Sequence, residues 1–209
     1  MSSYGRKRYD AGVTQLSLRE RRRAQTRLEI ARSACKLFAR DGYENVSAEL
    51  IAHECGVSER TFDRYFSSKE EVLSPIITDG AQELAEQIAE RPAEEDLATA
   101  VQRGYEQVSR HLHSADIQTL IGLLVEVPVL RARWLADLRT IEDALEPVVK
   151  QRAAEPLSDE QAQITAAAIV TALRASLEHS TQNGSAEPLA DTLGHTLRYI
   201  RDGANLRRR

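Results

Sequence analysis

The sequence has few cysteines, few aromatic residues and no long apolar run. Only Cys35 and Cys55 occur in 209 residues, which excludes the disulfide framework of a small secreted domain. The apolar runs fall far short of the ~20 residues that span a bilayer, so we expect no membrane partner. The first residues, MSSYGRKRYD, contain no apolar core and predict no signal peptide. These absences indicate a cytoplasmic protein.

Signatures of catalysis and of metal binding are also missing from the sequence. It has no Gly-rich phosphate loop, no nucleophile elbow and no pair of carboxylates placed for acid–base chemistry. His111 and His113 could suggest a metal site, but residues two apart on a helix point to different faces. The other three histidines show no ligand spacing. We therefore expect no catalytic residue, no metal and no cofactor, and a helical enzyme is the most distant of the functions considered.

Charge is distributed unevenly along the chain. The net charge is −4, which by itself does not indicate a nucleic-acid partner. However, residues 1–70 hold 14 Lys and Arg against 10 Asp and Glu, whereas residues 71–209 hold 14 against 22. A basic head on an acidic body is the pattern expected when one end of a protein meets phosphate. Chance clustering is the alternative.

Helical periodicity runs through the chain, and no alternating segment of useful length appears. The low aromatic content, 5%, suits a helical core built from Ala and Leu. We predict an all-α protein of about nine helices. Residues 1–16 form a disordered basic arm, residues 17–68 a three-helix head, and residues 69–209 a larger helical body.

Several helix ends are marked by local signals. Capping boxes beginning at Ser17, Ser68 and Ser158 predict three helix starts. The first helix should end near Asp41, because Gly42 tolerates the positive φ of a helix terminus. Its apolar residues recur at helical spacing and predict one buried stripe: Ala24, Leu28, Ala31, Cys35 and Phe38.

The most informative segment is residues 47–69, SAELIAHECGVSERTFDRYFSSK. It reads as a short helix from Ser47 to Cys55, a Gly56-Val57 turn, and a second helix from Ser58 to Tyr65. Small Ala52 allows the two helices to cross closely, and Gly56 allows a positive φ in the turn. Apolar residues fill the positions that should pack inside: Ile51, Cys55, Val57, Phe62 and Tyr65. This is the pattern of a helix-turn-helix.

A longer set of residues resembles the DNA-binding domain of the TetR family of bacterial repressors. The resemblance covers about residues 24–73. It rests on Leu37-Phe38, Gly42-Tyr43, Ile51-Ala52, Gly56-Val57-Ser58, Thr61-Phe62, Arg64-Tyr65-Phe66 and Lys69-Glu70. The family commonly has a phosphate-contacting Tyr where this chain has Asp63. A carboxylate would repel the DNA backbone, so Asp63 is expected to pair with Arg60 or Arg64 instead.

Residue chemistry assigns roles within the predicted DNA interface. Residues early in a recognition helix meet base edges, here Ser58, Arg60 and Thr61. Arg60 can read guanine O6 and N7, and Thr61 can touch a thymine methyl or a phosphate. Ser47, at a helix N-terminus, can bind phosphate together with free backbone N–H groups. Further phosphate or sugar contacts are expected from Tyr43, Arg64, Tyr65 and Lys69.

Basic residues before the helix-turn-helix are weaker candidates. Arg27, with Arg22 and Arg23, would add contacts to the DNA backbone, although a solvated helix face explains them equally well. Arg6–Arg8 could enter a minor groove, but a disordered basic tail without a partner is the favoured interpretation.

By resemblance to the family, the last two helices, about 159–182 and 187–206, form a four-helix homodimer interface. Small residues there allow close helix packing and leucines supply apolar area. The expected interface residues are Ala168, Thr171, Ala172, Ala175, Leu189, Leu193, Leu197 and Ile200. The alternative is that these residues cover only the protomer's own core.

Residues 84–180 also resemble the C-terminal domain of the mycofactocin-system regulators within this family. The matching pieces are Ala89-Glu-Arg-Pro92, Val127-Pro-Val-Leu130-Arg-Ala-Arg133 and Ala172-Leu-Arg-Ala175. The resemblance implies a small-molecule effector such as an acyl-CoA or another lipid-like molecule. Plausible pocket residues are Tyr105, Leu120, Leu124, Trp134, Leu138 and Leu173, for which plain core packing has at least equal weight.

Together these patterns predict a homodimeric transcriptional regulator, more readily a repressor than an activator. It would bind double-stranded DNA at a pseudo-palindromic operator and be released by a small-molecule effector. The alternative from another class is an effector-free architectural or partner-docking protein that binds DNA.

Overall fold

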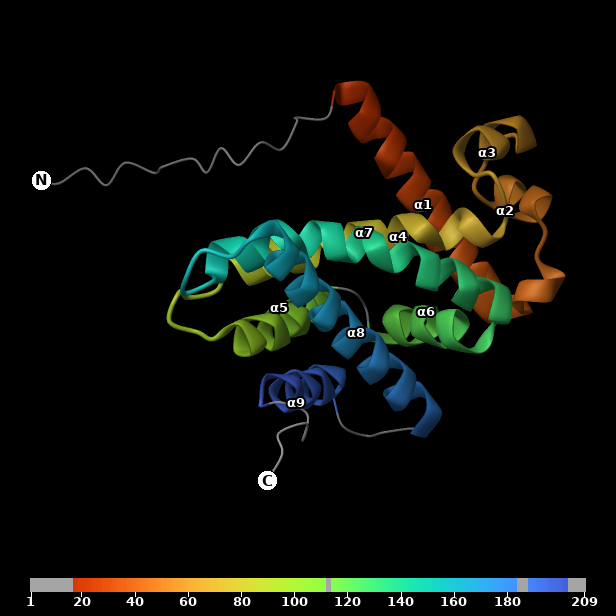
Figure 1. The fold of residues 1–209 in the computed structure, drawn as a ribbon. Helices are drawn as coiled ribbons and strands as arrows, with labels where there is room; N and C mark the ends of the chain where they lie inside the picture. Colours follow the sequence, from red (N-terminus) through yellow and green to blue (C-terminus); the bar gives the residue numbers. More distant parts are fainter. Residues whose placement is uncertain (1–16, 112–113, 184–187, 203–209) are drawn as a thin grey trace, which may run out of the picture.

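The computed structural model describes residues 17–111, 114–183 and 188–202, and within these ranges it is entirely helical (Figure 1). The predicted arm, residues 1–16 with Arg6–Arg8, lies outside the described residues. Among the described helices, none combines the length and apolarity that crossing a bilayer requires. The predicted all-α class is therefore confirmed.

The described residues contain nine α-helices and two short 3-10 segments. Their order is α1 Leu18–Asp41, η1 Tyr43–Asn45, α2 Ala48–Glu54, α3 Glu59–Tyr65, η2 Glu70–Leu73, α4 Ser74–Ala89, α5 Leu97–His111, α6 Ser114–Glu126, α7 Pro128–Arg152, α8 Asp159–Asn183 and α9 Leu189–Arg201. Helices α1, α2 and α3 build the head, and α4 to α9 build the body (Figure 1).

Two of the three predicted capping boxes are present. Ser17 accepts from the Glu20 backbone N–H at the start of α1, and Ser158 accepts from that of Gln161 at the start of α8. The box predicted at Ser68 is wrong. The Glu71 carboxylate accepts instead from the N–H and hydroxyl of Ser67, and η2 intervenes before α4 begins.

The buried stripe of α1 is shorter than its periodicity predicts. Leu28, Ala31, Cys35 and Phe38 are buried, but Ala24 is exposed. The first turns of α1 extend past the body, so Ala24 has no helix to pack against (Figure 1). The helix ends as expected at Gly42, whose φ is 82° and whose N–H donates to the Phe38 carbonyl.

One continuous apolar core joins head and body. It begins with α1 residues such as Ile30 and Phe38, passes through α4, and reaches Leu193 on α9. Helix α1 packs against α4, η2 and α6, so it belongs to both parts. The head therefore cannot shift without disturbing contacts made by α1 in the body.

Helices α4 and α7 form the central layer of the body and run parallel. At the start of α4, the Ser74 hydroxyl donates to the carboxylate of Asp137 on α7 at 2.5 Å. Arg133 Nε, also on α7, donates to Ser74 Oγ at 3.1 Å. At the end of α7, the Arg152 guanidinium donates to the carbonyl of Ile88, near the end of α4. Ser74 is 7% exposed, so the first of these polar contacts lies inside the protein.

Arg152 fixes the turn after α4. Its two terminal nitrogens donate to four carbonyl oxygens, those of Ile88, Arg91, Pro92 and Glu95, at 2.8 to 3.3 Å. Carbonyls at the end of a helix have no intrahelical partner, and a cation there also complements the helix dipole. One side chain thus satisfies the C-terminus of α4 and ties it to α7.

We expect Arg152→Met to lower the free energy of unfolding by about 2 kcal/mol, or the Tm by about 4–8 °C, because four carbonyls lose a charged donor. Arg40→Met is the matched control, since Arg40 is an exposed arginine whose ion pair is with its neighbour Asp41. Thermal melts followed by circular dichroism measure both. Equal melting temperatures for the two variants would contradict the assigned role.

Candidate DNA interface

The turn between α2 and α3 has the geometry that the sequence predicts. Gly56 adopts φ 66°, and the Val57 N–H donates to the Ala52 carbonyl at 2.9 Å. Ser58 then caps α3, accepting from the Thr61 N–H at 3.2 Å. The turn therefore joins the end of α2 to the start of α3 with four residues, Cys55 to Ser58.

Phe62 anchors the inner face of α3. It is 2% exposed, and its ring centroid lies 5.1 Å from that of Phe66, which is also buried. Ile51 and Ala52 of α2 are buried too, and Ala52 leaves room for the helices to approach. Burial of this face leaves the opposite face of α3 directed away from the core.

The outer face of α3 carries the predicted reading residues. Ser58, Arg60 and Arg64 are exposed, and Thr61 is half-buried. Within the described residues, no carboxylate pairs with Arg60, so its guanidinium is available to a ligand. The Ser58 and Thr61 hydroxyls lie 2.9 Å apart, so a base contact from either must share that hydrogen bond.

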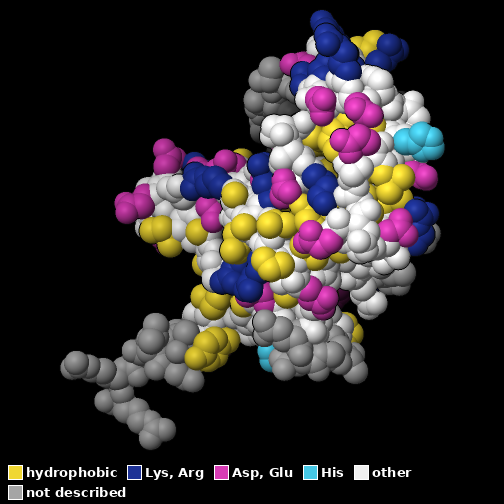
Figure 2. Space-filling view, turned by 90° about the vertical axis from the view of Figure 1, so that its right-hand side faces the viewer, with side chains coloured by type: hydrophobic (Ala, Val, Ile, Leu, Met, Phe, Trp, Pro, Cys, Tyr) yellow, Lys and Arg dark blue, Asp and Glu magenta, His cyan; other side chains and the backbone are white. Residues whose placement is uncertain are grey.

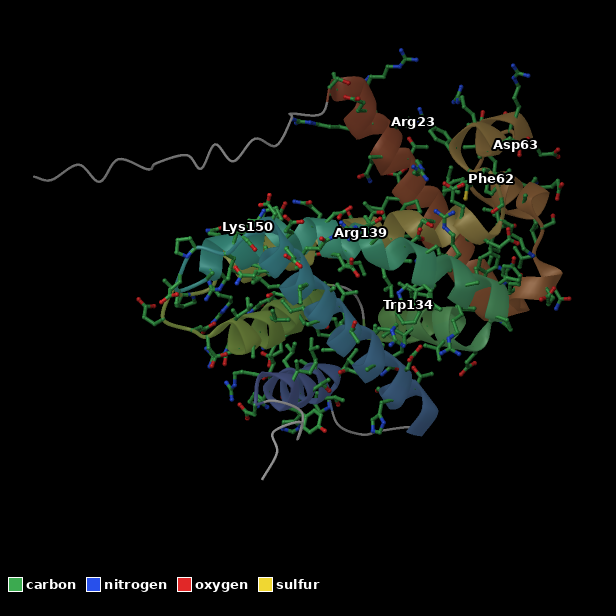
Figure 3. All side chains as sticks on the ribbon, viewed as in Figure 1. Arg23, Phe62, Asp63, Trp134, Arg139 and Lys150 are labelled. Atoms are coloured by element: carbon green, nitrogen blue, oxygen red, sulfur yellow. The ribbon has the colours of Figure 1, made fainter. Side chains whose placement is uncertain are left out.

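Asp63 follows buried Phe62 on α3 and is exposed (Figure 3). Its expected ion pair with Arg60 or Arg64 does not form among the residues that the structure describes. The carboxylate therefore remains as uncompensated negative charge on the outer face of α3. This charge opposes a phosphate contact at that position.

Tyr43 and Lys69 hold the head together in this structure. The Tyr43 ring is 6% exposed, and its hydroxyl donates to the Glu70 carboxylate. Burial, and then Glu70, raise the pKa of this phenol well above its usual range. Lys69 Nζ donates to the carbonyls of Tyr43 and Val46, both at 3.0 Å. A contact from either residue to DNA must open or share these bonds.

Arg27 and Ser47, also predicted to touch DNA, have structural partners as well. Arg27 pairs with Glu71 at 3.2 Å and lies 5.3 Å from the centroid of the Phe66 ring. Ser47 is exposed and caps α2 by accepting from the Leu50 N–H. Ser47 therefore lies at the surface position that its predicted role requires, whereas Arg27 is half-buried.

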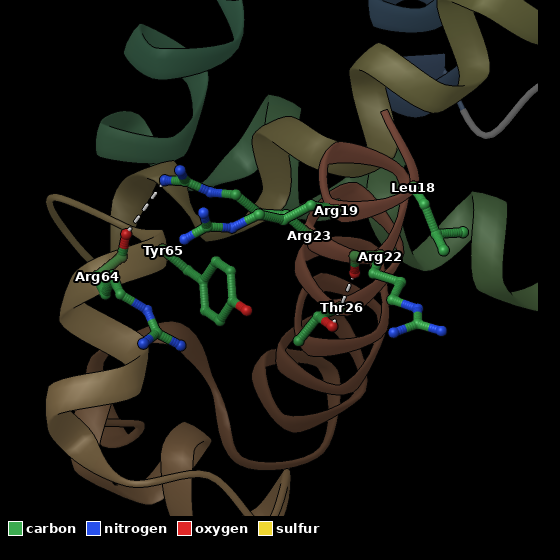
Figure 4. A pocket seen from close by; sticks show the side chains of 7 residues that line it. All are labelled: Leu18, Arg19, Arg22, Arg23, Thr26, Arg64 and Tyr65. Atoms are coloured by element: carbon green, nitrogen blue, oxygen red, sulfur yellow. Dashed lines mark hydrogen bonds between the residues drawn. The ribbon is translucent and has the colours of Figure 1, made fainter. Parts of the chain in front are cut away.

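A basic cleft lies between the first turns of α1 and the end of α3 (Figure 4). We call it the arginine cleft. It has a volume of about 540 Å³ and is lined by Leu18, Arg19, Arg22, Arg23, Thr26, Arg64 and Tyr65. Of its lining residues, Arg22, Arg23, Arg64 and Tyr65 are among the predicted DNA contacts. Arg19 is not, although the spacing of Arg19, Arg22, Arg23 and Thr26 places them on one helix face.

The arginine cleft and α3 lie at the same end of the molecule. Figure 2 shows a group of Lys and Arg side chains at the top of the head, whereas Lys, Arg, Asp and Glu side chains are mixed over the rest of this face. The basic part of the sequence thus forms a positively charged end of the molecule. Positive charge at one end favours and orients the approach of a polyanion.

The predicted effector residues are part of the body's core. Leu124, Trp134 (Figure 3) and Leu173 are buried, and Tyr105, Leu120 and Leu138 pack against the same cluster. Burial raises the pKa of Tyr105 to about 12. All six side chains therefore lie in or against the apolar core, as the core-packing interpretation requires.

The predicted dimer residues divide into two groups. Ala172, Leu193 and Leu197 are buried within the protomer. Thr171, Ala175 and Ile200 are exposed, and Ala168 and Leu189 are half-buried. The first group therefore packs in the protomer's own core, and the second remains accessible to a partner.

An apolar pocket of about 240 Å³ opens between α5, α8 and α9. Its lining includes Leu97, Val101, Ala168, Ile169 and Ile200. It is smaller than the roughly 300–1,000 Å³ of typical ligand sites. The neighbouring helices also expose Ile164 and Tyr199, which are 62% and 53% accessible. This side of the body therefore exposes apolar side chains at the surface of the protomer.

Two segments of the chain match protein families. Residues 30–75 match the bacterial regulatory proteins of the tetR family, and residues 91–205 match the MftR C-terminal domain. These segments correspond to the head and to most of the body described above.

Two relatives are transcriptional regulators of the helix-turn-helix type. The chain is 32% identical over 152 residues to the transcriptional regulator TcmR of Streptomyces glaucescens, an alignment that covers 68% of this chain and 67% of TcmR. It is 29% identical over 132 residues to the transcriptional repressor AcnR of Corynebacterium diphtheriae, covering 63% of this chain and 64% of AcnR.

Solved structures support the fold. Thermus thermophilus FadR, a TetR-family repressor crystallised with lauroyl-CoA, aligns with a TM-score of 0.57 at 20% identity, over 88% of this chain and 97% of FadR. Bacillus subtilis FadR, crystallised with stearoyl-CoA, gives 0.55 at 17% identity, over 84% and 98%. With a helix-turn-helix head, a helical body and these relatives, the chain belongs to the TetR family of transcriptional regulators.

Proposed function

We propose that the protein is a ligand-responsive repressor that binds a pseudo-palindromic operator as a homodimer. The observation that carries this proposal is the outer face of α3, where the guanidinium of Arg60, without an acidic partner among the described residues, lies on a helix anchored by buried Phe62. A rigid helix with a free bidentate donor is suited to reading guanine in a major groove. In a dimer, two such helices would lie one helical turn apart, about 34 Å.

The dimer proposal is supported by apolar surface on α8 and α9. Ile164, Tyr199 and Ile200 are accessible there, next to the apolar pocket between α5, α8 and α9. Apolar side chains in water favour association in proportion to the area they bury. A two-fold partner also matches the symmetry of a palindromic operator, which one short recognition helix would read only weakly.

The effector proposal is supported by relatives. Two FadR structures of the same fold contain lauroyl-CoA and stearoyl-CoA, and the body matches the MftR C-terminal domain. We propose an acyl-CoA or a similar lipid-like molecule. Because the residues proposed to line its site are packed in the core, the ligand would have to separate α5, α6 and α7 to enter.

The polar contacts of Ser74 offer a route from effector to DNA. They tie the start of α4, which follows the head directly, to Asp137 and Arg133 of α7. A ligand that moves α7 would displace α4 and thereby alter the spacing of the two heads. Release from DNA requires only that the ligand bind the altered spacing better than the operator-bound one.

Arg60→Ala should weaken operator binding by roughly 1–3 kcal/mol and relax the preference at one base-pair position of each half-site. The operator is first selected from a random duplex library with the wild-type protein, and affinities are then measured by fluorescence anisotropy. Arg40→Ala, on the far end of α1, is the control. Unchanged affinity and unchanged base preference in Arg60→Ala would refute the assignment of Arg60 as the reading residue.

Ile164→Lys should convert the dimer to a monomer, because a lysine buried at an interface without a partner costs several kcal/mol. Analytical ultracentrifugation measures the mass directly. Ala39→Lys introduces the same charge at an exposed position of α1 and should leave the dimer intact. A dimeric Ile164→Lys protein would mean that α8 does not form the interface at this position.

An acyl-CoA effector should raise the Tm by about 5 °C or more at a hundredfold excess over its Kd. A thermal-shift series of acyl-CoAs of increasing chain length, with free CoA as the control, tests this expectation. Dissociation of the operator complex by the same ligand separates a regulator from an effector-free architectural protein. If no acyl-CoA shifts the Tm, the effector belongs to another class.

A further inference from the structure

Three charged side chains join α7 to α8 in the body, and we call them the Arg131 cluster. The Glu178 carboxylate accepts from Arg131 of α7 at 2.8 Å and from Arg174 of α8 at 2.6 Å. Arg174 lies one helical turn before Glu178 and already balances its charge. Arg131 therefore leaves the cluster with an excess of positive charge, in a part of the chain where acidic residues outnumber basic ones.

The guanidinium of Arg131 has donors left for a further partner. Its Nε–H is buried and has no hydrogen-bond partner among the described residues. A buried donor without a partner lowers stability. The side chain as a whole is 42% exposed, so an anion from solvent can reach it. Arg27 and Arg152 also have a buried, unpaired Nε, so the surroundings of Arg131 decide what the feature means.

Arg131 begins an apolar stripe on α7. Trp134 and Leu138 follow it at three and seven residues, which places the three side chains on one face of the helix. Trp134 is 3% exposed, and Leu138 packs against the same apolar core (Figure 3). A cation at the end of an apolar stripe matches a molecule with an anionic end and an apolar chain.

Helix α6 covers this part of the body and packs against both α7 and α8 (Figure 1). Its residues from Leu120 to Leu123 are only half-buried. A Cβ on Gly122 would meet no atom within 4 Å, whereas a Cβ on Gly104 of α5 would come within 2.9 Å of the Ile88 side chain. Close packing therefore explains Gly104 but not Gly122. Because an interior glycine weakens a helix, α6 is suited to give way to a ligand.

We propose that the Arg131 cluster binds the anionic end of an amphipathic effector, whose apolar chain lies along Trp134 and Leu138 beneath α6. A phosphate or a carboxylate matches the paired donors of a guanidinium. The anion would displace Glu178 from Arg131, while Arg174 would keep its own ion pair with that carboxylate. The inference rests on the proposed effector function and assigns the residues that would hold the charged end of the ligand.

The probes are molecules with the same ten-carbon chain and different ends: decanoyl-CoA, decanoate, decanol and decylamine. Trp134 is the sole tryptophan of the chain, so its fluorescence reports binding next to the cluster. The wild type should bind at least one of the two anionic probes more tightly than decanol, and decylamine more weakly than decanol. The source of the anion follows from the probe that binds, because decanoyl-CoA offers phosphate and decanoate offers carboxylate.

Arg131→Gln should weaken the preferred anionic probe roughly tenfold, because it removes a charge-assisted hydrogen bond, and should leave decanol unchanged. Glu178→Gln should tighten the same probe roughly fivefold, because it removes a competing negative charge. Arg139→Gln is the matched control. Arg139 is another arginine of α7 that pairs with a carboxylate, and its removal should leave all four affinities at the wild-type values.

Opposite changes in the two cluster variants, confined to anionic probes, would support the proposal. A cluster that only ties α7 to α8 predicts instead that both variants lose affinity for every probe, and that result would overturn it. Wild-type affinity of Arg131→Gln for the anionic probe would also overturn it and leave the proposed effector function standing. Failure of all four probes to bind the wild type would reject both. If Arg131→Gln does not fold, Glu178→Gln decides, since a folding defect cannot tighten binding.

Discussion

The parallel packing of α4 against α7 is the constraint on which the rest of the structure depends. Ser74 contacts Asp137 near one end of the pair, and Arg152 fastens the last turn of α4 near the other. The start of α4 adjoins η2, whose Glu71 pairs with Arg27 of α1. Head and body are therefore linked by a short series of polar contacts within one continuous core, and the orientation of α3 follows from them.

The protein uses arginine in two different ways. In the body, arginines pair with carboxylates or, like Arg152, satisfy the backbone at the end of a helix. At the top of the head, Arg60 and the arginines of the cleft have no acidic partner among the described residues. This division, rather than the net charge of −4, is what gives the molecule a polyanion-binding end.

Features encoded by neighbouring residues could be predicted from the sequence, and features that depend on distant residues could not. The caps at Ser17 and Ser158, and the positive φ of Gly42 and Gly56, rest on interactions within a few positions. The start of α4 and the exposure of Ala24 were predicted wrongly. The burial of Leu193 within the protomer was left open. The exposure of Ala24 and the burial of Leu193 depend on which helix lies alongside, and local sequence does not contain that information. At the start of α4, the Glu71 carboxylate bonds to neighbouring Ser67 instead of to Ser68.

The pairing of α4 with α7 also bears on the order of folding. The contacts of Ser74 with Asp137 and of Ile88 with Arg152 join residues more than sixty positions apart in the chain. Closing so long a loop has an entropic cost that local helix contacts do not share. During synthesis the helix-turn-helix can form early and α1 can pack against α4, whereas α4 itself can be fixed to the rest of the body only after α7 has emerged. The contacts of Ser74 with Asp137 and of Ile88 with Arg152 therefore form later than the local contacts of the helix-turn-helix.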